Sequence, residues 1–531
     1  MKRWGWPALI LSTALLLRLL CLGNKPLHFD EGVNGSFVDQ MTRDGFYHYE
    51  PSNYHGPLHF YSLFTAQTLL GRHAWALRLP TALVSTACVA LLLAFQSPFG
   101  KRPARIAAAA MALSPAMTFY GRYAIHETWL VFFLLLAFWG LLHFHTAGTR
   151  RSLWALCAGI TGILLTKETG FLHIAAALIA LPVLRAWERF SPSLPPLAPP
   201  GHAPTDPAPP QWTKRDLFNA ICTCSAVLVF FYSGCLLDWS SLPGFWQSPF
   251  QWMITGTGGE SGHEKPWFYW FALLFSYEWP ALLGLVFSLF FLLRSGTPHS
   301  TRLLALYAAG AFAAYTLVSY KTPWCLISLT WPWLLLFGIA IDHISQPLHR
   351  TAASAIAKGA AALLLLHSSA HTLLLNFRNP TDEDHLYVYV QTLPEVRLLL
   401  DPLESLTRQN PIHRQLRGAL VLPELHPWSW LLNDYPNVLI CLPEELTETV
   451  GPRDFLLVDS SLAASIEAQL DERYFKDSFR IRGNTSDPAI LYLRAHTFAS
   501  CFPDRTPEFA PDKIQPPAQP QPESATQGRK P

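Results

Sequence analysis

The strongest constraint on this chain is a long succession of apolar runs separated by short basic or polar turns. Only 14% of its 531 residues are charged, whereas soluble domains average about 25%. A membrane-spanning helix needs roughly 17–25 apolar residues, and the order of the runs predicts about 11 transmembrane helices even though several are short. The runs cover residues 6–17, 79–95, 106–120, 129–144, 153–165, 171–184, 218–237, 267–293, 303–318, 324–341 and 355–375.

The turns predict the orientation of these spans. Lys2 and Arg3 precede the first run, and basic residues recur in every second turn. Because Lys and Arg concentrate on the cytoplasmic side, we expect a multi-pass protein of the plasma (inner) membrane, with a cytoplasmic amino terminus and an extracytoplasmic C-terminal domain. The short runs on either side of Lys167 also fit a re-entrant hairpin, which leaves the later topology unchanged. Arg18 interrupts the first run and no A-x-A site follows, so we expect a signal anchor rather than a cleaved signal peptide.

Composition divides the rest of the chain. We expect a transmembrane domain over 1–375, with its first extracytoplasmic loop at 24–74 and a Pro-rich cytoplasmic linker at 190–214. An α/β domain is predicted for 376–505 and a disordered tail for 506–531. Within the α/β domain the pattern predicts a helix at 462–470 and strands at 386–390, 419–422, 438–441, 455–459, 479–482 and 489–494.

Charge and cysteine content narrow the classes of ligand. A net charge of +2 gives no excess of positive charge for nucleic acid. Most of the nine cysteines fall in or beside apolar runs at no metal-ligand spacing. We therefore predict no metal site and no certain cofactor, with a divalent cation left open. Cys441 and Cys501 lie in the outer domain, and the sequence leaves open whether they pair.

Polar residues gather at the predicted outer ends of the spans, where the positive-inside rule leaves few charges. Carboxylates there can take a proton from a hydroxyl, while Lys and Arg can hold a phosphate. An aromatic and amide-rich loop at 46–54 suits a sugar, and the apolar spans suit a lipid tail. This predicts a lipid-linked sugar phosphate as substrate, although a proton-coupled transporter would use similar groups. The segments are 28–31, 54–58, 120–122, 126–127, 167–168 and 319–324.

Several of these segments resemble motifs of the GT-C superfamily of membrane glycosyltransferases, nearest to the protein O-mannosyltransferases and the lipid A aminoarabinose transferases. The motifs are an Asp-Glu pair after the first span, a His-x-Pro-Leu element and an Arg followed by an acid five residues later. A prokaryotic group called flippase activity-associated proteins shares two further elements, Lys-Glu-Thr and Lys-x-Pro-Trp. They stand here at Asp30-Glu31, His55–Leu58, Arg122–Glu127, Lys167–Thr169 and Lys321–Trp324.

The resemblance covers about the first 345 residues and implies inverting transfer from a polyprenyl-phosphate sugar to an extracytoplasmic protein, lipid or glycan. It implies that Asp30 is the general base, with Glu31 and Glu127 as further acids of the site. Substrate-binding roles follow for His55, Arg122, Lys167, Lys321 and Trp324. His-Gly-Pro-Leu replaces the usual His-Pro-Pro-Leu, the second acid is Glu rather than Asp, and the outer domain is unlike theirs, which leaves the acceptor open.

Other interpretations remain open from sequence alone. The chain fits a non-catalytic component associated with flipping of lipid-linked sugars, or a transporter or polysaccharide ligase. Transporters more often carry internal repeats with broken helices, which this sequence does not show. For single residues the plain alternatives are interfacial anchoring of Lys321 and Trp324 and a local salt bridge for Glu168. The outer domain is expected to bind acceptor or partner, since it shows no catalytic pattern of its own.

Overall fold

The computed structural model describes residues 5–53, 55–190, 211–257, 262–345, 352–446, 449–483 and 488–511. The described chain forms two compact units. The first holds residues up to Lys25 and from Val33 to Tyr389, and is helical. The second begins at Val390 and also takes in Pro26–Gly32. Most of the predicted Pro-rich linker (191–210) and most of the predicted tail (512–531) lie outside the described residues.

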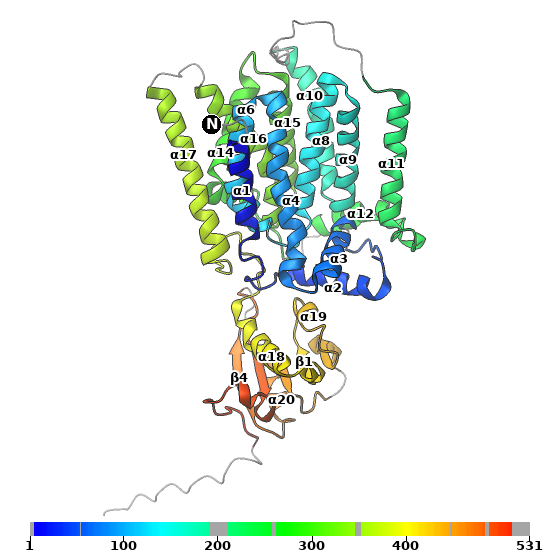
Figure 1. Ribbon diagram of the computed structural model, residues 1–531, viewed down its shortest axis with the longest axis vertical. Coiled ribbons are helices and arrows are strands. Elements are labelled where there is room, and N and C mark those ends of the chain that lie inside the picture. The colour runs from blue at the N-terminus through cyan, green and yellow to red at the C-terminus, as the bar shows by residue number, and fades with distance from the viewer. Residues whose placement is uncertain are drawn as a thin grey trace, which may run out of the picture. The chain divides into compact units, whose positions relative to one another are not determined.

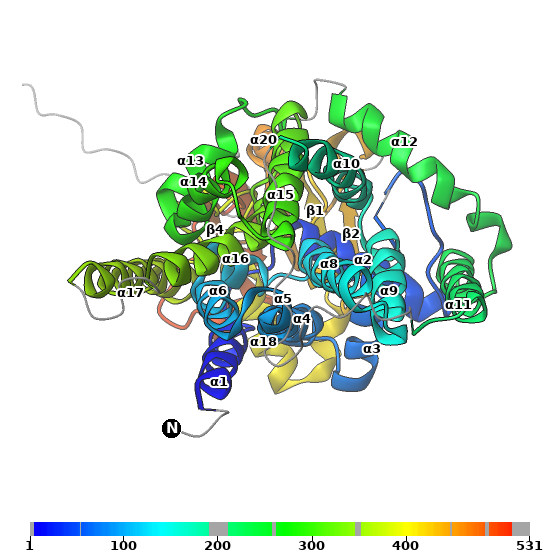
Figure 2. The same cartoon turned by 90° about the horizontal axis from the view of Figure 1, so that it is seen from above.

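The helical unit is a bundle whose long helices run side by side (Figure 1). Viewed along the helices, α17 and α11 lie at opposite edges of this bundle (Figure 2). Shorter helices and loops join the long ones. The helices are α1 (Gly5–Leu19), α2 (Phe29–Asp44), α3 (Leu58–Leu70), α4 (Ala74–Ala94), α5 (Gln96–Phe99), α6 (Lys101–Leu113), α7 (Pro115–Tyr120), α8 (Glu127–Ala147), α9 (Arg150–Thr166), α10 (Gly170–Glu188), α11 (Lys214–Tyr232), α12 (Gly244–Thr257), α13 (Tyr269–Tyr277), α14 (Trp279–Leu293), α15 (His299–Leu317), α16 (Leu326–Ser345) and α17 (Ala352–Leu373).

Among the described residues, six helices are long and apolar enough to cross a membrane, and α1 and α14 are shorter apolar helices. The protein is thus a multi-pass helical membrane protein, but the predicted count of about 11 spans is not confirmed. One reason is visible at Glu278, where the apolar run 267–293 breaks into α13 and α14. The runs around Lys167 form the separate helices α9 and α10.

Helix α16 forms the centre of the bundle. In the candidate span Pro323–Ser345, 89% of the most apolar window is buried, against 50% or less in the other five. Close packing on α16 depends on small residues: a side chain at Gly284 of α14 would collide with the Trp333 carbonyl, and one at Gly338 would collide with the Pro103 carbonyl. Glycine at such positions lets backbones approach, which is how apolar helices gain contact energy in lipid.

The second unit contains a five-stranded sheet in the order β2-β1-β3-β5-β4. Strands β1 (Gly418–Val421), β2 (Val438–Cys441) and β3 (Phe455–Asp459) are parallel, whereas β5 (Ala489–Arg494) is antiparallel to both β3 and β4 (Tyr474–Phe479). Alternate residues of the strands point to opposite faces of the sheet and pack into two apolar cores. One includes α18 (Arg397–Gln409), and the other includes Ile466 of α20 (Ala463–Glu467).

The strand predictions were right for 438–441, 455–459 and 489–494, and 419–422 was shifted by one residue. Two predicted strands were wrong. Residues 386–390 contain no strand, because Tyr387 and Val388 pack into the core of the helical unit. The fourth strand lies at Tyr474–Phe479 rather than 479–482. Cys441 and Cys501 are free thiols that pack in different cores, so they form no disulfide.

The predicted orientation can be tested with two engineered cysteines in a chain whose exposed Cys21 and Cys222 are replaced by Ser. Asp384 and Arg151 are both exposed. Because Arg151 follows the basic turn expected inside, an impermeant maleimide on intact cells should label Asp384→Cys and leave Arg151→Cys unlabelled until the membrane is opened. Labelling of Arg151→Cys from outside would invert the topology.

Candidate functional site

The predicted Asp-Glu pair lies in the first turn of α2, and this turn belongs to the second unit. The side chain of Glu31 accepts a hydrogen bond from the His28 backbone N–H at 2.9 Å. Reciprocally, the Asp30 N–H donates to His28 Nδ1 at 3.0 Å. This is the geometry of a capping box, with histidine in the place usually taken by Ser or Thr. Glu31 and His28 are both fully buried, so their role in this structure is to fix the turn.

Asp30 differs from its neighbours because its carboxylate is not used in this cap. It is half-buried, and among the described residues of its unit its side chain makes no hydrogen bond or ion pair. A carboxylate at the second position of a helix is favoured by the helix dipole. The turn therefore presents an ionisable oxygen whose backbone is fixed and whose lone pairs remain available for a proton.

In the helical unit, three of the predicted site residues and Glu168 form a continuous chain of charged contacts. Lys167, between α9 and α10, donates to Glu127 at the start of α8 and lies 3.9 Å from Glu168. Glu168 in turn contacts His55 Nδ1 at 2.8 Å. Burial would by itself raise the pKa of Glu168, but His55 and Lys167 outweigh it and lower that pKa. The local salt bridge weighed from sequence is thus present, as part of a larger cluster.

Two further imidazoles join this cluster. The His126 ring lies 4.6 Å from His55 and 4.4 Å from His59, centroid to centroid. His126 is buried, and its Nε2 has no hydrogen-bond partner among the described residues. His59 lies in the first turn of α3 and was not singled out from sequence, since His55 belongs to the loop before this helix and helical spacing does not link the two residues. We call His55, His59, His126, Glu127, Lys167 and Glu168 the buried polar cluster.

Arg122 is not part of that cluster. Its guanidinium donates to the carbonyl oxygens of Leu17, Arg18, Leu20 and Cys21 at 2.7–3.2 Å. It also lies 4.9 Å from the ring of Phe377. The last carbonyls of a helix have no partner within the helix, so Arg122 closes the carboxyl end of α1.

Lys321 also binds carbonyl oxygens. Its ammonium donates to the Val318 carbonyl and, at 3.3 Å, to the Lys265 carbonyl. Trp324 is buried, with its ring 6.0 Å from Tyr389 and 6.3 Å from Tyr120. Neither residue is an exposed interfacial anchor in this structure.

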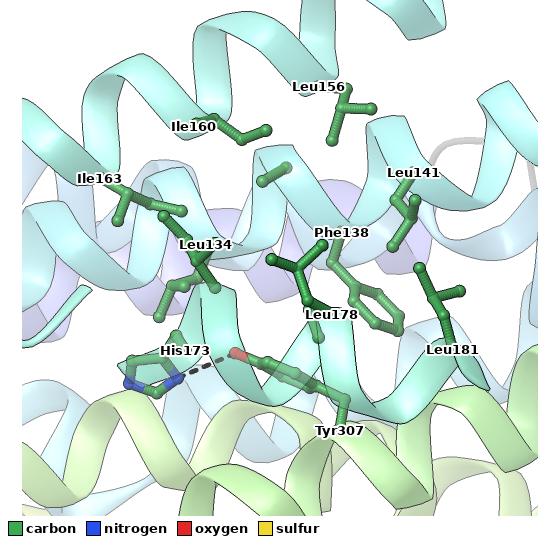
Figure 3. Close-up of a pocket in the computed structure, with 13 residues that line it drawn as sticks. Leu134, Phe138, Leu141, Leu156, Ile160, Ile163, His173, Leu178, Leu181 and Tyr307 are labelled. Atoms are coloured by element: carbon green, nitrogen blue, oxygen red, sulfur yellow. Dashed lines mark hydrogen bonds between the residues drawn. The ribbon is translucent and has the colours of Figure 1, made fainter. Parts of the chain in front are cut away.

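An apolar cavity of about 190 Å³ lies between α8, α9, α10 and α15. Leu134, Phe138, Leu178 and neighbouring aliphatic side chains line it, as Figure 3 shows. Its polar end is His173, whose two ring nitrogens contact the Tyr307 hydroxyl at 3.0 Å and the Ser328 hydroxyl at 3.2 Å. His173 lies one helical turn into α10, so the cavity begins close to Lys167 and Glu168 in the chain.

Two structural residues were missed from the sequence. Arg78 donates to the carbonyls of Leu22 and Lys25, both at 2.9 Å. Glu278 accepts hydrogen bonds from the Ser114 hydroxyl and, at 2.7 Å, from the Ala116 N–H. A single acid in an otherwise apolar run was the available signal for Glu278.

Within the described ranges, no group of three or more His, Cys, Asp or Glu residues is placed to hold a metal ion.

Comparisons with known proteins bear on the family and the fold. The sequence model of the dolichyl-phosphate-mannose-protein mannosyltransferases matches residues 54–197, which include all six residues of the buried polar cluster. YkcB of Bacillus subtilis (strain 168), provisionally named a mannosyltransferase, is 38% identical over 100 residues, 18% of this chain and 14% of YkcB.

Two solved structures share the fold over nearly the whole chain. ArnT from Cupriavidus metallidurans, bound to undecaprenyl phosphate, gives a TM-score of 0.56 at 14% identity, covering 92% of this chain and 98% of ArnT. The oligosaccharyltransferase AglB from Archaeoglobus fulgidus, in complex with an inhibitory peptide and a dolichol-phosphate, gives 0.51 at 12% identity, covering 94% and 77%. The chain thus shares the fold of ArnT and AglB, and its residues 54–197 are similar to the dolichyl-phosphate-mannose-protein mannosyltransferases.

The structural role of Arg122 can be tested by measuring the stability of a variant. Arg122→Gln should lower the free energy of unfolding by about 1–3 kcal/mol, because carbonyls at the end of α1 lose a charged donor. Thermal unfolding of the purified protein in detergent measures this. Arg102→Gln, at an exposed position, is the matched control, and equal stability of both variants would contradict the assigned contacts.

Proposed function

We propose that this protein transfers a sugar from a polyprenyl-phosphate-linked donor to an acceptor on the extracytoplasmic side of the membrane. The observation that carries the proposal is the Asp30 carboxylate, which is unpaired within the described part of its unit while His28 and Glu31 fix its backbone. The GT-C fold and the mannosyltransferase match support the reaction class. YkcB and this chain share too little of their length to define a donor sugar or an acceptor.

In the proposed reaction Asp30 acts as general base. Its carboxylate takes the proton of an acceptor hydroxyl while the hydroxyl oxygen forms a bond to the anomeric carbon. The bond from that carbon to the phosphate oxygen breaks on the opposite face, and the electron pair leaves with polyprenyl phosphate. Configuration at the anomeric carbon is inverted, and the balance requires no other reactant.

The donor is assigned to the helical unit. ArnT has been solved with undecaprenyl phosphate and AglB with a dolichol-phosphate, which supports a polyprenyl phosphate here. We assign its phosphate to cations among Lys167, Lys321 and Arg122, with His55, Glu127 and Trp324 lining the site. The apolar cavity next to His173 suits a segment of the isoprenoid chain. In the structure all three cations have partners in the helical unit: Arg122 and Lys321 bind carbonyl oxygens, and Lys167 binds Glu127.

The direct test is to incubate the purified protein with a panel of radiolabelled polyprenyl-phosphate sugars and measure release of free lipid phosphate. Release from one sugar in preference to the others is expected. Absence of turnover with every donor, in a protein that still binds lipid phosphate, would favour the non-catalytic component of lipid-sugar flipping instead.

Asp30→Asn keeps the shape of the side chain and removes its basicity. Transfer should therefore fall by about 10²–10⁴-fold with the donor KM little changed. Glu31→Gln is the matched control, because the amide oxygen can still accept the His28 N–H, and its activity should stay close to the parent. Transfer by Asp30→Asn at the parent rate would remove the general base from the mechanism.

Lys321→Met should raise the donor KM by about tenfold, the cost of a lost hydrogen bond to a charged group, with kcat changed less. Initial rates at a series of donor concentrations measure both constants. Lys358→Met, at an exposed position of α17, is the control for loss of a positive charge. An unchanged donor KM would leave Lys321 with its carbonyl contacts alone.

A further inference from the structure

The turn that carries Asp30 belongs to the second unit, called the C-terminal unit below, and Phe29 beside Asp30 packs inside that unit. The Phe29 ring meets the His426 ring edge-on, with centroids 5.6 Å apart. On the same ring, the guanidinium of Arg482 lies 5.1 Å from the centroid, and Arg482 is also ion-paired with Glu424. The charge of Arg482 is therefore met by a carboxylate other than Asp30.

The backbone of the turn is held equally closely. A Cβ at Gly32 would lie 2.5 Å from Pro427 Cα and 2.7 Å from Pro427 Cβ, distances that real Cβ atoms do not reach. Only glycine allows this approach. On the other side of Asp30, the Gln391 side chain donates to the Pro26 carbonyl at 3.0 Å, and His28 forms an isolated β-bridge with Gln391.

The contacting residues occupy a particular place in the sheet. Glu424, His426 and Pro427 follow directly after β1. In the order β2-β1-β3, the chain leaves β1 toward β2 on one side and returns to β3 on the other. The crevice outside the carboxyl ends of strands at such a switch point is where open α/β sheets bind ligands.

We propose that the C-terminal unit is part of the catalytic apparatus, with His426 as the residue that positions Asp30. This inference rests on the proposed function and goes against the expectation that the outer domain binds acceptor or partner without a part in the chemistry. His426 holds the Phe29 ring, and Pro427 holds Gly32, so the turn is fixed on both sides of the carboxylate.

The His426 ring that packs on this turn carries no positive charge near pH 7. Burial lowers the pKa of His426, although the nearby Asp30 acts to raise it, so the imidazole is neutral near pH 7. Its Nδ1 is 2.7 Å from the Ser429 hydroxyl. A neutral ring supplies the contact with Phe29 without adding a positive charge to the turn.

The test measures kcat and donor KM for His426→Ala, His426→Phe and Gly32→Ala in the full-length protein. His426→Ala and Gly32→Ala should each lower kcat about tenfold or more, with donor KM unchanged, since a small displacement of a catalytic group is costly. His426→Phe keeps the ring contact and should restore most of the rate. His496→Ala and Gly359→Ala, at exposed sites where Gly359 has open space for a Cβ, are the matched controls.

A double-mutant cycle separates positioning from general structural damage. His426→Ala added to Asp30→Asn should cost no further rate, because the group that it positions has already lost its function. The same fold loss in both backgrounds, or parent kcat for both His426→Ala and Gly32→Ala, would overturn the inference. If Asp30→Asn itself kept the parent rate, the general-base proposal would fail first, and the two failures are thereby distinguished.

Discussion

The helical unit depends on supplying hydrogen-bond donors to backbone carbonyls at the ends of apolar helices. In lipid an unsatisfied carbonyl costs several kcal/mol because no water can replace the lost partner. Here the donors are buried cations. Arg18 donates to the Met111 and Ala112 carbonyls and to the Ser85 hydroxyl, and Arg78, Arg122 and Lys321 bind other carbonyl groups. These buried residues bind carbonyls that would otherwise lack a donor inside the protein.

This use of cations changes how the acids should be interpreted. Since several cations are directed to carbonyls, most buried carboxylates have other partners. Glu127 and Glu168 share Lys167, Glu168 also contacts His55, and Glu278 is satisfied by the hydroxyl of Ser114 and the Ala116 N–H. Asp30 stands outside this pattern because nothing described in its unit neutralises it. A group that the fold positions without satisfying is a better candidate for chemistry than one whose charge already stabilises the protein.

The sequence predicted the class of fold and the motifs, but less of what each residue does. Apolar runs and turn charges were sufficient for a multi-pass helical protein with a separate α/β domain. The number of spans could not be predicted from the apolar runs, because a run such as 106–120 is divided at Ser114 into two short helices. Contacts between distant segments were also invisible. Spacing alone cannot reveal that Arg122 binds the end of α1, that Glu31 caps its own helix, or that Phe29 meets His426.

The contact between Phe29 and His426 is the basis for giving the C-terminal unit a part in the proposed chemistry. Helix α2 begins within the C-terminal unit and continues into the helical one, where Asn34 donates to the Ala124 carbonyl at 2.8 Å and Asp39 pairs with both arms of Arg72. The start of α2 is held within the C-terminal unit by the contacts of Phe29 and Gly32. A catalytic group held in this way loses little entropy when substrate binds. Under the proposed function, the rate of transfer depends on residues of the C-terminal unit that need not touch the sugar donor. This is the reason for seeking catalytic effects in a domain whose sequence shows no catalytic motif.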